Sequence, residues 1–307
     1  MPYDITIKKV AIAGATGKLG SAIITELLRS GLFDITVLTR DPSTHTFPDG
    51  LQVVKVDYGN VESLVTPLHG QDALVSAVPT GAILEQRLLI DAAVTAGVKR
   101  FIPSEFGCDL KNAKARALPV FTSKVNIEDY LRELAEKGVI SYTLIYNGPF
   151  LDMGLEYSMF LNFKDRKAEI YDGGDQEFSC IRLATAGKIV RRVLTHPRET
   201  ADRAVWVKEI DISQNKLLQL AQSLTPGEKW EVTYVDTAEL EKQCLEQIRD
   251  NQDGPQTMLN LLKCAVFGHG YGSKFEHVHN GTLGIRTITT SDLEELVARV
   301  LRTKALE

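Results

Sequence analysis

The chain has 307 residues, of which 44% are hydrophobic and 24% are charged, and its net charge is −5 at neutral pH. This is the composition of an ordinary folded protein, and the length allows one large domain or a domain with a smaller companion. Because the basic residues are scattered without a run, the sequence has no footprint for nucleic acid or for an anionic membrane surface. We therefore expect the partner to be a small molecule, uncharged or weakly charged.

The cysteines and the first residues of the chain indicate the cellular compartment in which the protein is expected. The four cysteines are widely spaced and form no CxxC pair, which argues against a disulfide framework and against a zinc site. The amino terminus lacks the pattern of a signal peptide, and no apolar run approaches the roughly 18 residues that a membrane span needs. The expectation is a cytoplasmic protein, monomeric or homodimeric, without a membrane partner.

Short β-rich apolar segments alternate with helical patterns through the first half of the chain. Strands are predicted at residues 10–13, 35–38, 51–56, 73–78, 100–103 and 142–146. Helices with one apolar face are predicted at about residues 18–30, 61–68, 82–96 and 119–136. Six strands with intervening helices predict an α/β fold, a doubly wound parallel sheet of the Rossmann type.

After about Phe150 this alternation stops. The later sequence indicates helices, a hairpin turning at residues 172–174, and single strands near residues 204–207 and 230–234. Such a smaller α+β portion would pack beside the carboxyl ends of the sheet strands, where open α/β folds bind their ligands. We therefore divide the chain into a cofactor-binding Rossmann domain at residues 1–152 and a smaller substrate-binding portion at residues 153–307.

A glycine-rich segment follows the first predicted strand and opens the first helix. Its residues are Gly14, Ala15, Thr16, Gly17, Lys18, Leu19 and Gly20. Glycines in this context let the backbone turn tightly and approach a pyrophosphate, which the amides of the helix amino terminus stabilise. The third glycine would allow close packing of the helix on the strand. The G-x-x-G-x-x-G spacing is that of short-chain dehydrogenases, and a chance cluster of glycines is the alternative.

The end of the second strand indicates which dinucleotide binds. NAD-selective domains carry an acid there, whereas this chain has Arg40. A guanidinium can bind a 2′-phosphate through paired hydrogen bonds, and Lys18 would add charge, so NADP(H) is the predicted cofactor. In the alternative interpretation Arg40 is only solvated and Asp41 binds the ribose. Four further residues end the third and fourth strands and are predicted to face the cofactor, with a role in local turns as the alternative: Asp57, Tyr58, Val78 and Pro79.

No tyrosine in the chain is followed four residues later by a lysine, so the usual Tyr-x-x-x-Lys proton relay is absent. The helix predicted from Pro119 offers another acid, because Lys124 is the only charged residue on its apolar stripe. The other members of the stripe are Val120, Ile127, Leu131 and Leu134. Lys124 either reaches solvent along its aliphatic stem or lies beside the nicotinamide as a general acid.

Together these motifs resemble the NmrA-like and isoflavone-reductase-like branch of the atypical short-chain dehydrogenases. The likeness rests on the glycine loop, on Arg40 and Lys124, and on the segments 100–107 and 147–150. It implies that Lys124 acts in catalysis and that NADPH delivers a hydride to a phenolic substrate. In the regulatory members the cofactor is bound without turnover. We add Ser104, Asn147 and Pro149 to the expected cofactor contacts.

Other residue patterns are weaker. Four large side chains are predicted to gather at the ligand crevice and to suit an aromatic or terpenoid substrate, with a place in the core as the alternative: Phe106, Phe150, Met153 and Tyr157. His277 and His279 alternate as metal ligands on a strand can, but no nearby Cys or carboxylate completes a set, and no metal is expected.

The sequence thus predicts an NADPH-dependent reductase of a small, largely apolar metabolite, with Lys124 as the general acid. Two alternatives remain open. One is a non-catalytic sensor of NADP(H) redox state, which the missing tyrosine relay favours and an inward-facing lysine disfavours. The other is an enzyme that uses bound nicotinamide in a cyclisation or isomerisation without net redox change.

Overall fold

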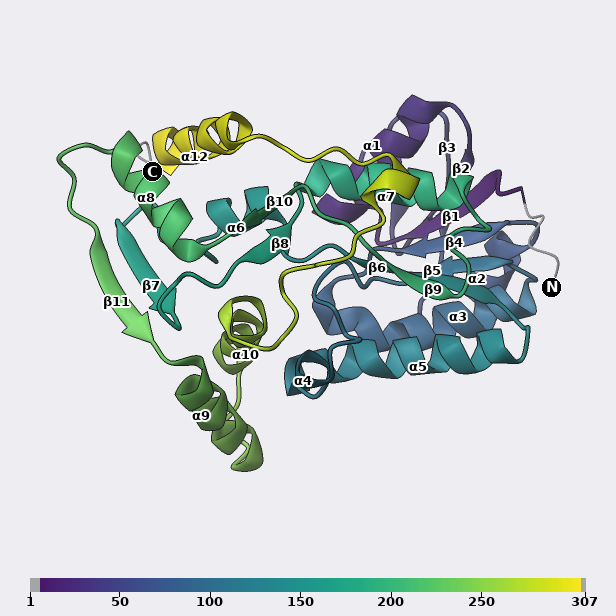
Figure 1. Ribbon diagram of the computed structural model, residues 1–307. Helices are drawn as coiled ribbons and strands as arrows, with labels where there is room; N and C mark the ends of the chain where they lie inside the picture. The colour runs from purple at the N-terminus through teal and green to yellow at the C-terminus, as the bar shows by residue number, and fades with distance from the viewer. Residues whose placement is uncertain (1–5, 305–307) are drawn as a thin grey trace.

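A computed structural model describes residues 6–304. Its centre is a seven-stranded parallel sheet with the order β3-β2-β1-β4-β5-β6-β9 (Figure 1). The strands are β1 (Lys9–Ala13), β2 (Asp34–Thr39), β3 (Leu51–Lys55), β4 (Ala73–Ser76), β5 (Arg100–Ile102), β6 (Ser141–Tyr146) and β9 (Arg203–Trp206). The reversal of strand order at β1 and β4 is that of a doubly wound fold, so the predicted class is confirmed.

Helices cover both faces of the sheet. Those of the first half are α1 (Lys18–Ser30), α2 (Val61–Leu68), α3 (Gln86–Thr95), α4 (Ala113–Arg116) and α5 (Thr122–Glu136). Three short 3-10 turns accompany these elements. The first, η1 (Pro42–Thr44), follows β2, whereas η2 (Thr80–Glu85) precedes α3 and η3 (Pro119–Phe121) precedes α5. The apolar periodicity placed α1 and α2 at the observed residues, and the predicted helices near 82–96 and 119–136 each begin as 3-10 turns.

Alternate residues of each strand enter two separate cores, as the two-residue period of a strand requires. Ala11, Leu74 and Phe101 pack with α2, α3 and α5, whereas Val10 and Val75 pack with α1 and with α7 (Leu183–Thr195). Figure 1 shows α1 and α7 above the sheet and α3 and α5 below it. Both faces are thus buried, which explains why the strands are apolar runs without alternation.

The second half of the chain contributes to this sheet. Strand β9 pairs with β6, and helix α7 packs directly on α1, where a Cβ on Gly187 would lie 2.4 Å from the Ala22 carbonyl oxygen. The sheet and its covering helices therefore include segments from beyond residue 153, and the predicted boundary between residues 152 and 153 does not separate two independent domains. A strand near residues 204–207 is predictable from its apolar sequence, but its partner is not, because pairing depends on contacts far along the chain.

The remaining elements form a smaller portion beside the sheet (Figure 1). Its strands are β7 (Lys167–Tyr171), β8 (Phe178–Cys180), β10 (Ile210–Ile212) and β11 (Glu231–Val235). Its helices are α6 (Leu151–Glu156), α8 (Gln214–Leu224), α9 (Thr237–Arg249), α10 (Pro255–Phe267) and α12 (Thr290–Lys304). The short helix α11 (Asn280–Leu283) instead packs on α7 above the sheet. Phe160, Phe178 and Phe267 form its aromatic centre.

The hairpin predicted at residues 172–174 is wrong. The chain does turn there, with positive φ at Asp172, Gly173 and Gly174, but β7 pairs in parallel with β11 and β8 pairs with β10. The Asp172 carboxylate accepts hydrogen bonds from the backbone N–H and the hydroxyl of Thr237, at 2.8 and 2.6 Å. The turn is thereby held to the start of α9 instead of folding β8 back onto β7.

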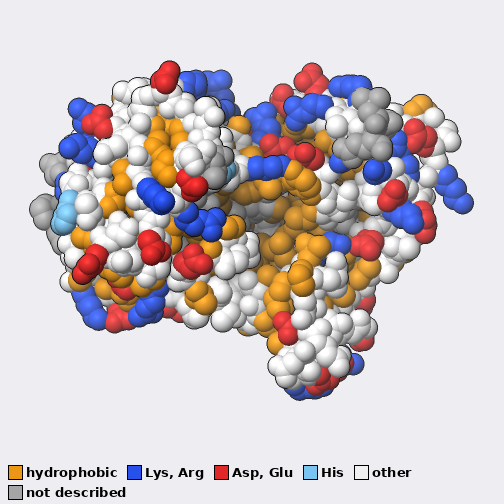
Figure 2. All heavy atoms as spheres, turned by 180° about the vertical axis from the view of Figure 1, so that it is seen from behind, with side chains coloured by type: hydrophobic (Ala, Val, Ile, Leu, Met, Phe, Trp, Pro, Cys, Tyr) orange, Lys and Arg blue, Asp and Glu red, His pale blue; other side chains and the backbone are white. Residues whose placement is uncertain are grey.

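Figure 2 shows hydrophobic side chains gathered in the hollow between the two lobes of the molecule, seen from behind. Of the helices within residues 6–304, none combines the length and apolarity that a membrane crossing requires. Residues 1–5, on which the cytoplasmic expectation partly rests, lie outside the described part of the chain.

Arg100 joins the sheet to the segment before β9. The side chain is buried, and its guanidinium donates hydrogen bonds to the Thr143 hydroxyl at 3.0 Å, the Thr200 hydroxyl at 3.3 Å and the Pro197 carbonyl at 2.7 Å. These acceptors come from β6 and from the turn that leads into the last strand. The guanidinium therefore fixes the edge of the sheet that the second half supplies.

Replacement of Arg100 by Met should lower the free energy of unfolding by about 2–3 kcal/mol, because it leaves buried acceptors without donors. Urea unfolding monitored by circular dichroism measures this loss. The exposed Arg299 on α12 provides the control, since Arg299→Met should change stability by less than about 0.5 kcal/mol. An Arg100→Met protein as stable as the control would contradict the structural role of this guanidinium.

Candidate active site

A cleft of about 620 Å³ lies at the carboxyl ends of β1, β2, β4 and β5. Many of the residues predicted to bind cofactor or substrate line it: Gly14, Thr16, Gly17, Lys18, Leu19, Arg40, Tyr58, Val78, Pro79, Ser104, Phe106, Lys124, Phe150 and Met153. They come together because the loops after parallel strands all emerge at one edge of the sheet. The cleft also includes residues that the sequence did not single out, such as Thr39, Ile83 and Leu183.

Two glycines of the loop are required by packing. Gly14 has φ +77°, and a Cβ there would lie 2.4 Å from the Ala77 carbonyl oxygen. A Cβ on Gly20 would lie 2.2 Å from the Gly14 carbonyl oxygen. Gly20 therefore holds α1 close to the loop and does not line the cleft, as expected for the third glycine.

Gly17 has a different environment. A Cβ there would meet only the Gly14 carbonyl oxygen, at the ordinary contact distance of 3.5 Å. Gly17 is also the N-cap residue of α1 and supplies no side-chain hydrogen bond to the first helical amides. Helix amides without a capping side chain are free to bind an anion, and a glycine lets that anion approach the backbone closely. This region fits a pyrophosphate.

The alternative role of Asp41 is disfavoured by its contacts. Its carboxylate accepts hydrogen bonds from the Ser43 backbone N–H at 2.9 Å and the Ser43 hydroxyl at 2.7 Å, and these bonds lower its pKa. Asp41 thus caps η1 and does not line the cleft. Arg40 is exposed and does line it, at the edge where a ribose phosphate would extend.

Tyr58 lies in the wall of the cleft and donates a hydrogen bond to the Leu38 carbonyl at 2.9 Å. Burial raises the pKa of this phenol to about 12, so it stays neutral. Its neighbour Asp57 accepts a hydrogen bond from the Gly59 backbone N–H at 2.9 Å and does not line the cleft. Its contact is that of a local turn.

Three more predicted residues lie outside the cleft lining. Asn147 is buried and donates to the Gly148 carbonyl at 2.6 Å, and Pro149 is half-buried beside it. The backbone N–H groups of Asn147 and Gly148 both donate to the Gly107 carbonyl, at 3.1 and 2.9 Å. These residues therefore join β6 to the segment after β5. Tyr157 is exposed, and its hydroxyl accepts a hydrogen bond from the Lys18 ammonium.

Lys124 lies in the first turn of α5 and points into the cleft wall. Its ammonium donates a hydrogen bond to the Glu105 backbone carbonyl and lies 3.8 Å from the Glu105 carboxylate. Only 17% of its side chain is exposed, and what is exposed faces the cleft. This placement is compatible with a proton donor and differs from that of a lysine whose ammonium extends into bulk solvent.

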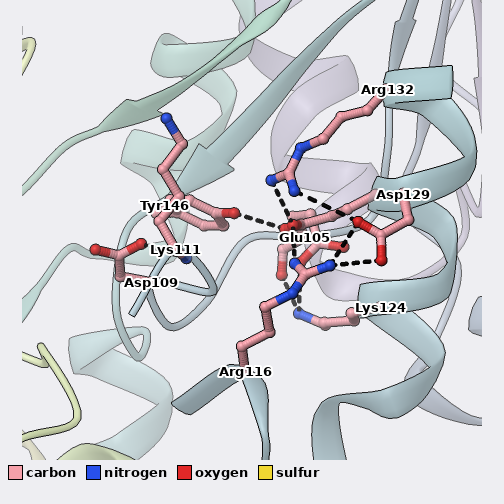
Figure 3. A network of polar contacts seen from close by, with 9 residues as sticks. Glu105, Asp109, Lys111, Arg116, Lys124, Asp129, Arg132 and Tyr146 are labelled. Carbon is pink, nitrogen blue, oxygen red and sulfur yellow. Dashed lines mark hydrogen bonds and ion pairs between the residues drawn. The ribbon is translucent and has the colours of Figure 1, made fainter. Parts of the chain in front are cut away.

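The expectation that Lys124 is the only charge on the inward side of its helix is wrong. Glu128, four residues later, is fully buried. It accepts hydrogen bonds from the Tyr146 hydroxyl at 2.6 Å, from Arg116 at 3.2 Å and from Arg132 at 3.0 Å. Figure 3 shows Arg116, Arg132 and Tyr146 pointing to the carboxylate that accepts these bonds, with Glu105 and Lys124 beside it.

Burial dominates the electrostatics of the network. It raises the pKa of Glu105 to about 8, against the opposing effect of Lys124. Burial also raises the pKa of Glu128, although Tyr146 and the two arginines oppose it, and raises that of Tyr146. One feature of the sequence indicates the buried network, namely the (i, i+4) spacing of Glu128 and Arg132. Such pairs are usually solvated on the exposed face of a helix, so the spacing alone does not predict burial.

The two histidines considered as metal ligands lie elsewhere. The His279 ring stacks on Trp206 with 5.8 Å between ring centres, and its Nδ1 lies 3.3 Å from the Trp206 backbone nitrogen. Within the part of the chain that the structure describes, no group of three or more His, Cys, Asp or Glu residues is placed to hold a metal.

A doubly wound sheet with an uncapped, glycine-rich helix start above its strand ends defines the class of Rossmann-type proteins. The NmrA-like family model matches residues 6–279, and the chain belongs to this family. The predicted family resemblance is thereby confirmed.

Relatives extend over nearly the whole chain. It is 33% identical to oxidoreductase aprR of Aspergillus flavus over 299 residues, which cover 96% of this chain and 99% of the relative. It is also 33% identical to oxidoreductase poxI of Penicillium oxalicum, over 96% of this chain and 94% of that one. The isoflavone reductase homolog IRL of Zea mays is 28% identical over 87% of this chain and 89% of its own.

Solved structures share the fold. A complex of AtPrR2 with NADP+ and (+)pinoresinol superposes with a TM-score of 0.71 at 23% identity, covering 96% of this chain and 99% of the other. The ternary complex of leucoanthocyanidin reductase from Vitis vinifera gives a TM-score of 0.73 at 21% identity, with the same coverage. The sheet and the smaller portion beside it are therefore a shared architecture.

The buried carboxyl of Glu105 should make stability depend on pH. Its folded pKa of about 8 is above the ordinary 4.5, so the wild type loses stability as pH rises from about 5 through 8. Glu105→Gln cannot ionise, and its urea midpoint relative to wild type should therefore rise between about pH 5 and pH 9.

Glu26 is a suitable control for this measurement. Burial raises its pKa, but hydrogen bonds from Arg29 and Arg191 outweigh burial and the net pKa is lowered. The difference between Glu26→Gln and wild type should then be constant over the same range, because Glu26 is ionised in both states. A constant difference for Glu105→Gln as well would contradict the raised pKa.

Proposed function

We propose that this protein is an NADPH-dependent reductase of a small, largely apolar metabolite. The observation that carries the proposal is the position of Lys124, whose ammonium is held in the wall of the cleft that the glycine loop opens. The names of the two fungal relatives support the class of oxidoreductase.

The residues of the loop fit the cofactor. The amides at the start of α1 would bind the pyrophosphate, with Gly17 allowing its close approach, and Arg40 would bind the 2′-phosphate. NADPH, when bound, supplies the hydride. AtPrR2 and leucoanthocyanidin reductase, which share the fold, have been crystallised with NADP+ and NADPH respectively, in agreement with this assignment.

The substrate side of the cleft is apolar. Phe106 follows β5, whereas Phe150 and Met153 lie at the start of α6, and Leu183 begins α7. Such a surface suits an aromatic or terpenoid-like molecule. Lys124 would give a proton to the anion that forms as the substrate is reduced, and its hydrogen bond to the Glu105 carbonyl would orient it for that step.

Turnover can be tested with three probes, (+)-pinoresinol, an isoflavone and a benzoquinone. We expect consumption of NADPH, followed by absorbance, to match formation of a reduced product, followed by mass spectrometry. Product without consumption of NADPH would instead support the non-redox alternative. Tight binding of NADPH without any turnover would support the sensor.

Replacement of Arg40 by Ala should weaken NADPH binding by about tenfold or more and leave NADH binding almost unchanged, because only NADPH carries the 2′-phosphate. Isothermal titration with both cofactors measures this. Lys55, exposed at the end of β3 and absent from the cleft lining, gives the matched control Lys55→Ala. Equal losses for NADPH and NADH would count against the role of Arg40.

Lys124→Met should lower kcat by about 10²-fold or more on any probe that the wild type reduces, with little change in the Kd for NADPH. Methionine keeps the length of the side chain and removes the proton. Lys137 caps the opposite, carboxyl-terminal end of α5 and has 61% of its side chain exposed, so Lys137→Met is the control. Wild-type kcat in Lys124→Met would exclude the lysine as proton donor.

A further inference from the structure

The carboxyl group of Glu105 is sealed into the protein directly behind Lys124. Its side chain is 1% exposed, and Oε1 has no hydrogen-bond partner in the described structure. Oε2 lies 3.8 Å from the Lys124 ammonium, which also donates to the backbone carbonyl of the same residue. Glu105 therefore meets this ammonium with both its main chain and its side chain.

The neighbouring charges are distributed unevenly between the two buried carboxyls. Glu128 binds Arg116, Arg132 and the Tyr146 hydroxyl, so its charge is matched. Glu105 forms an ion pair with Lys124 and with neither arginine. The groups whose charge acts on Glu105 are Lys124, Glu128 and Arg132 from α5, Arg116 from α4, Tyr146 from β6 and the Cys108 thiol.

The backbone holds Glu105 in this orientation. The next residue, Phe106, has φ +32°, a conformation that costs a non-glycine residue of the order of 1 kcal/mol or more. The following Gly107 is bound to β6 through its carbonyl, which accepts from the Asn147 and Gly148 amides. Phe106 and Glu105 both contribute to the cleft lining, but only 1% of the Glu105 side chain is exposed. The backbone conformation of Phe106 and the buried carboxyl of Glu105 both lower the stability of the fold, and both lie next to Lys124.

We propose that Glu105 is a positioning residue that aims the Lys124 ammonium with its carbonyl and stores, on its carboxyl, the proton that restores this ammonium after each reduction. The inference rests on the proposed role of Lys124. An N–H bond of the ammonium breaks as the substrate anion is protonated. The O–H bond of Glu105 then breaks, and a new N–H bond forms on Lys124. When the product leaves and water enters the cleft, an N–H bond of Lys124 breaks to restore the O–H bond of Glu105, and Lys124 takes a new proton from the solvent, which it contacts with the exposed part of its side chain.

The electrostatics agree with this assignment. With a pKa of about 8, the Glu105 carboxyl is largely protonated at neutral pH. Because the carboxyl lies 3.8 Å from the lysine nitrogen, a Lys124 amine that has lost its proton can take one directly from Glu105. At higher pH, ionised Glu105 instead holds the ammonium in its charged form.

Two measurements on the whole protein test this without cofactor or substrate. The first is acylation of Lys124 by trace acetic anhydride across a pH series, quantified by peptide mass spectrometry with Lys137 as internal standard. The second is the infrared band of a protonated carboxyl group. Both compare wild type with Glu105→Gln and Glu105→Asp, and Glu26→Gln serves as a buried-carboxylate control at a remote site.

In Glu105→Gln the Lys124 amine should lose its proton at lower pH, so that acylation near pH 9 is about tenfold faster than in wild type. The infrared difference between wild type and this variant should contain a protonated carboxyl band that disappears as pH rises through about 8. Glu105→Asp should retain the band and return acylation towards the wild-type rate, and Glu26→Gln should match wild type in both.

An acylation profile in Glu105→Gln that superposes on wild type, or an infrared difference without the band, would overturn the proposal. An Asp variant that behaves like the Gln variant would assign the effect to packing and overturn it equally. Since neither measurement requires turnover, a protein that passes both and reduces no probe contradicts only the proposed function.

Discussion

The close approach of the β1–α1 loop to the end of β4 is the constraint on which the cleft depends. A side chain at Gly14 would overlap the Ala77 carbonyl, and one at Gly20 would overlap the Gly14 carbonyl. These contacts bring the amino terminus of α1 directly above the strand ends. The same helix is held from behind by α7, at Gly187. The open helix amides are thus fixed on two sides and need little rearrangement to bind an anion.

This arrangement also explains why the second half of the chain is inseparable from the first. Helix α7 and strand β9 belong to the sheet domain, while α6, which carries Met153 and is preceded directly by Phe150, begins five residues after β6 ends. The residues that form the apolar wall of the cleft therefore follow strand β6 of the central sheet after only a few residues. A wall anchored in this way keeps a fixed distance from the loop that would hold the cofactor, as hydride transfer requires.

The sequence predicted the parts of the structure that local physics determines. Six strands, the first two helices and the glycine loop follow from periodicity and from glycine stereochemistry. The hairpin at residues 172–174 was wrong because turn residues specify a reversal but not the partner strand. Glu128 was missed for a similar reason, since its burial depends on Arg116 from α4 and Tyr146 from β6. Whether Asp57, Asn147 and Pro149 contact a cofactor remains a prediction. The local contact of Asp57 accounts for its placement, whereas the buried side-chain oxygen of Asn147 has no hydrogen-bond partner in the described structure.

The network behind Lys124 is difficult to explain as a source of stability. Burying a carboxylate costs several kcal/mol, and even a paired buried ion seldom adds more than an apolar side chain of the same volume. Glu128 offsets this cost with three hydrogen-bond partners, yet Glu105 has a single ion-pair partner and a strained neighbour. Apolar residues could fill the same space at lower cost, as they do around Ile127 and Leu131 one and two turns along the helix. A carboxyl kept at such cost beside Lys124 is accounted for by its effect on that lysine, because Lys124 is the side chain with which Glu105 forms its ion pair and it lines the cleft.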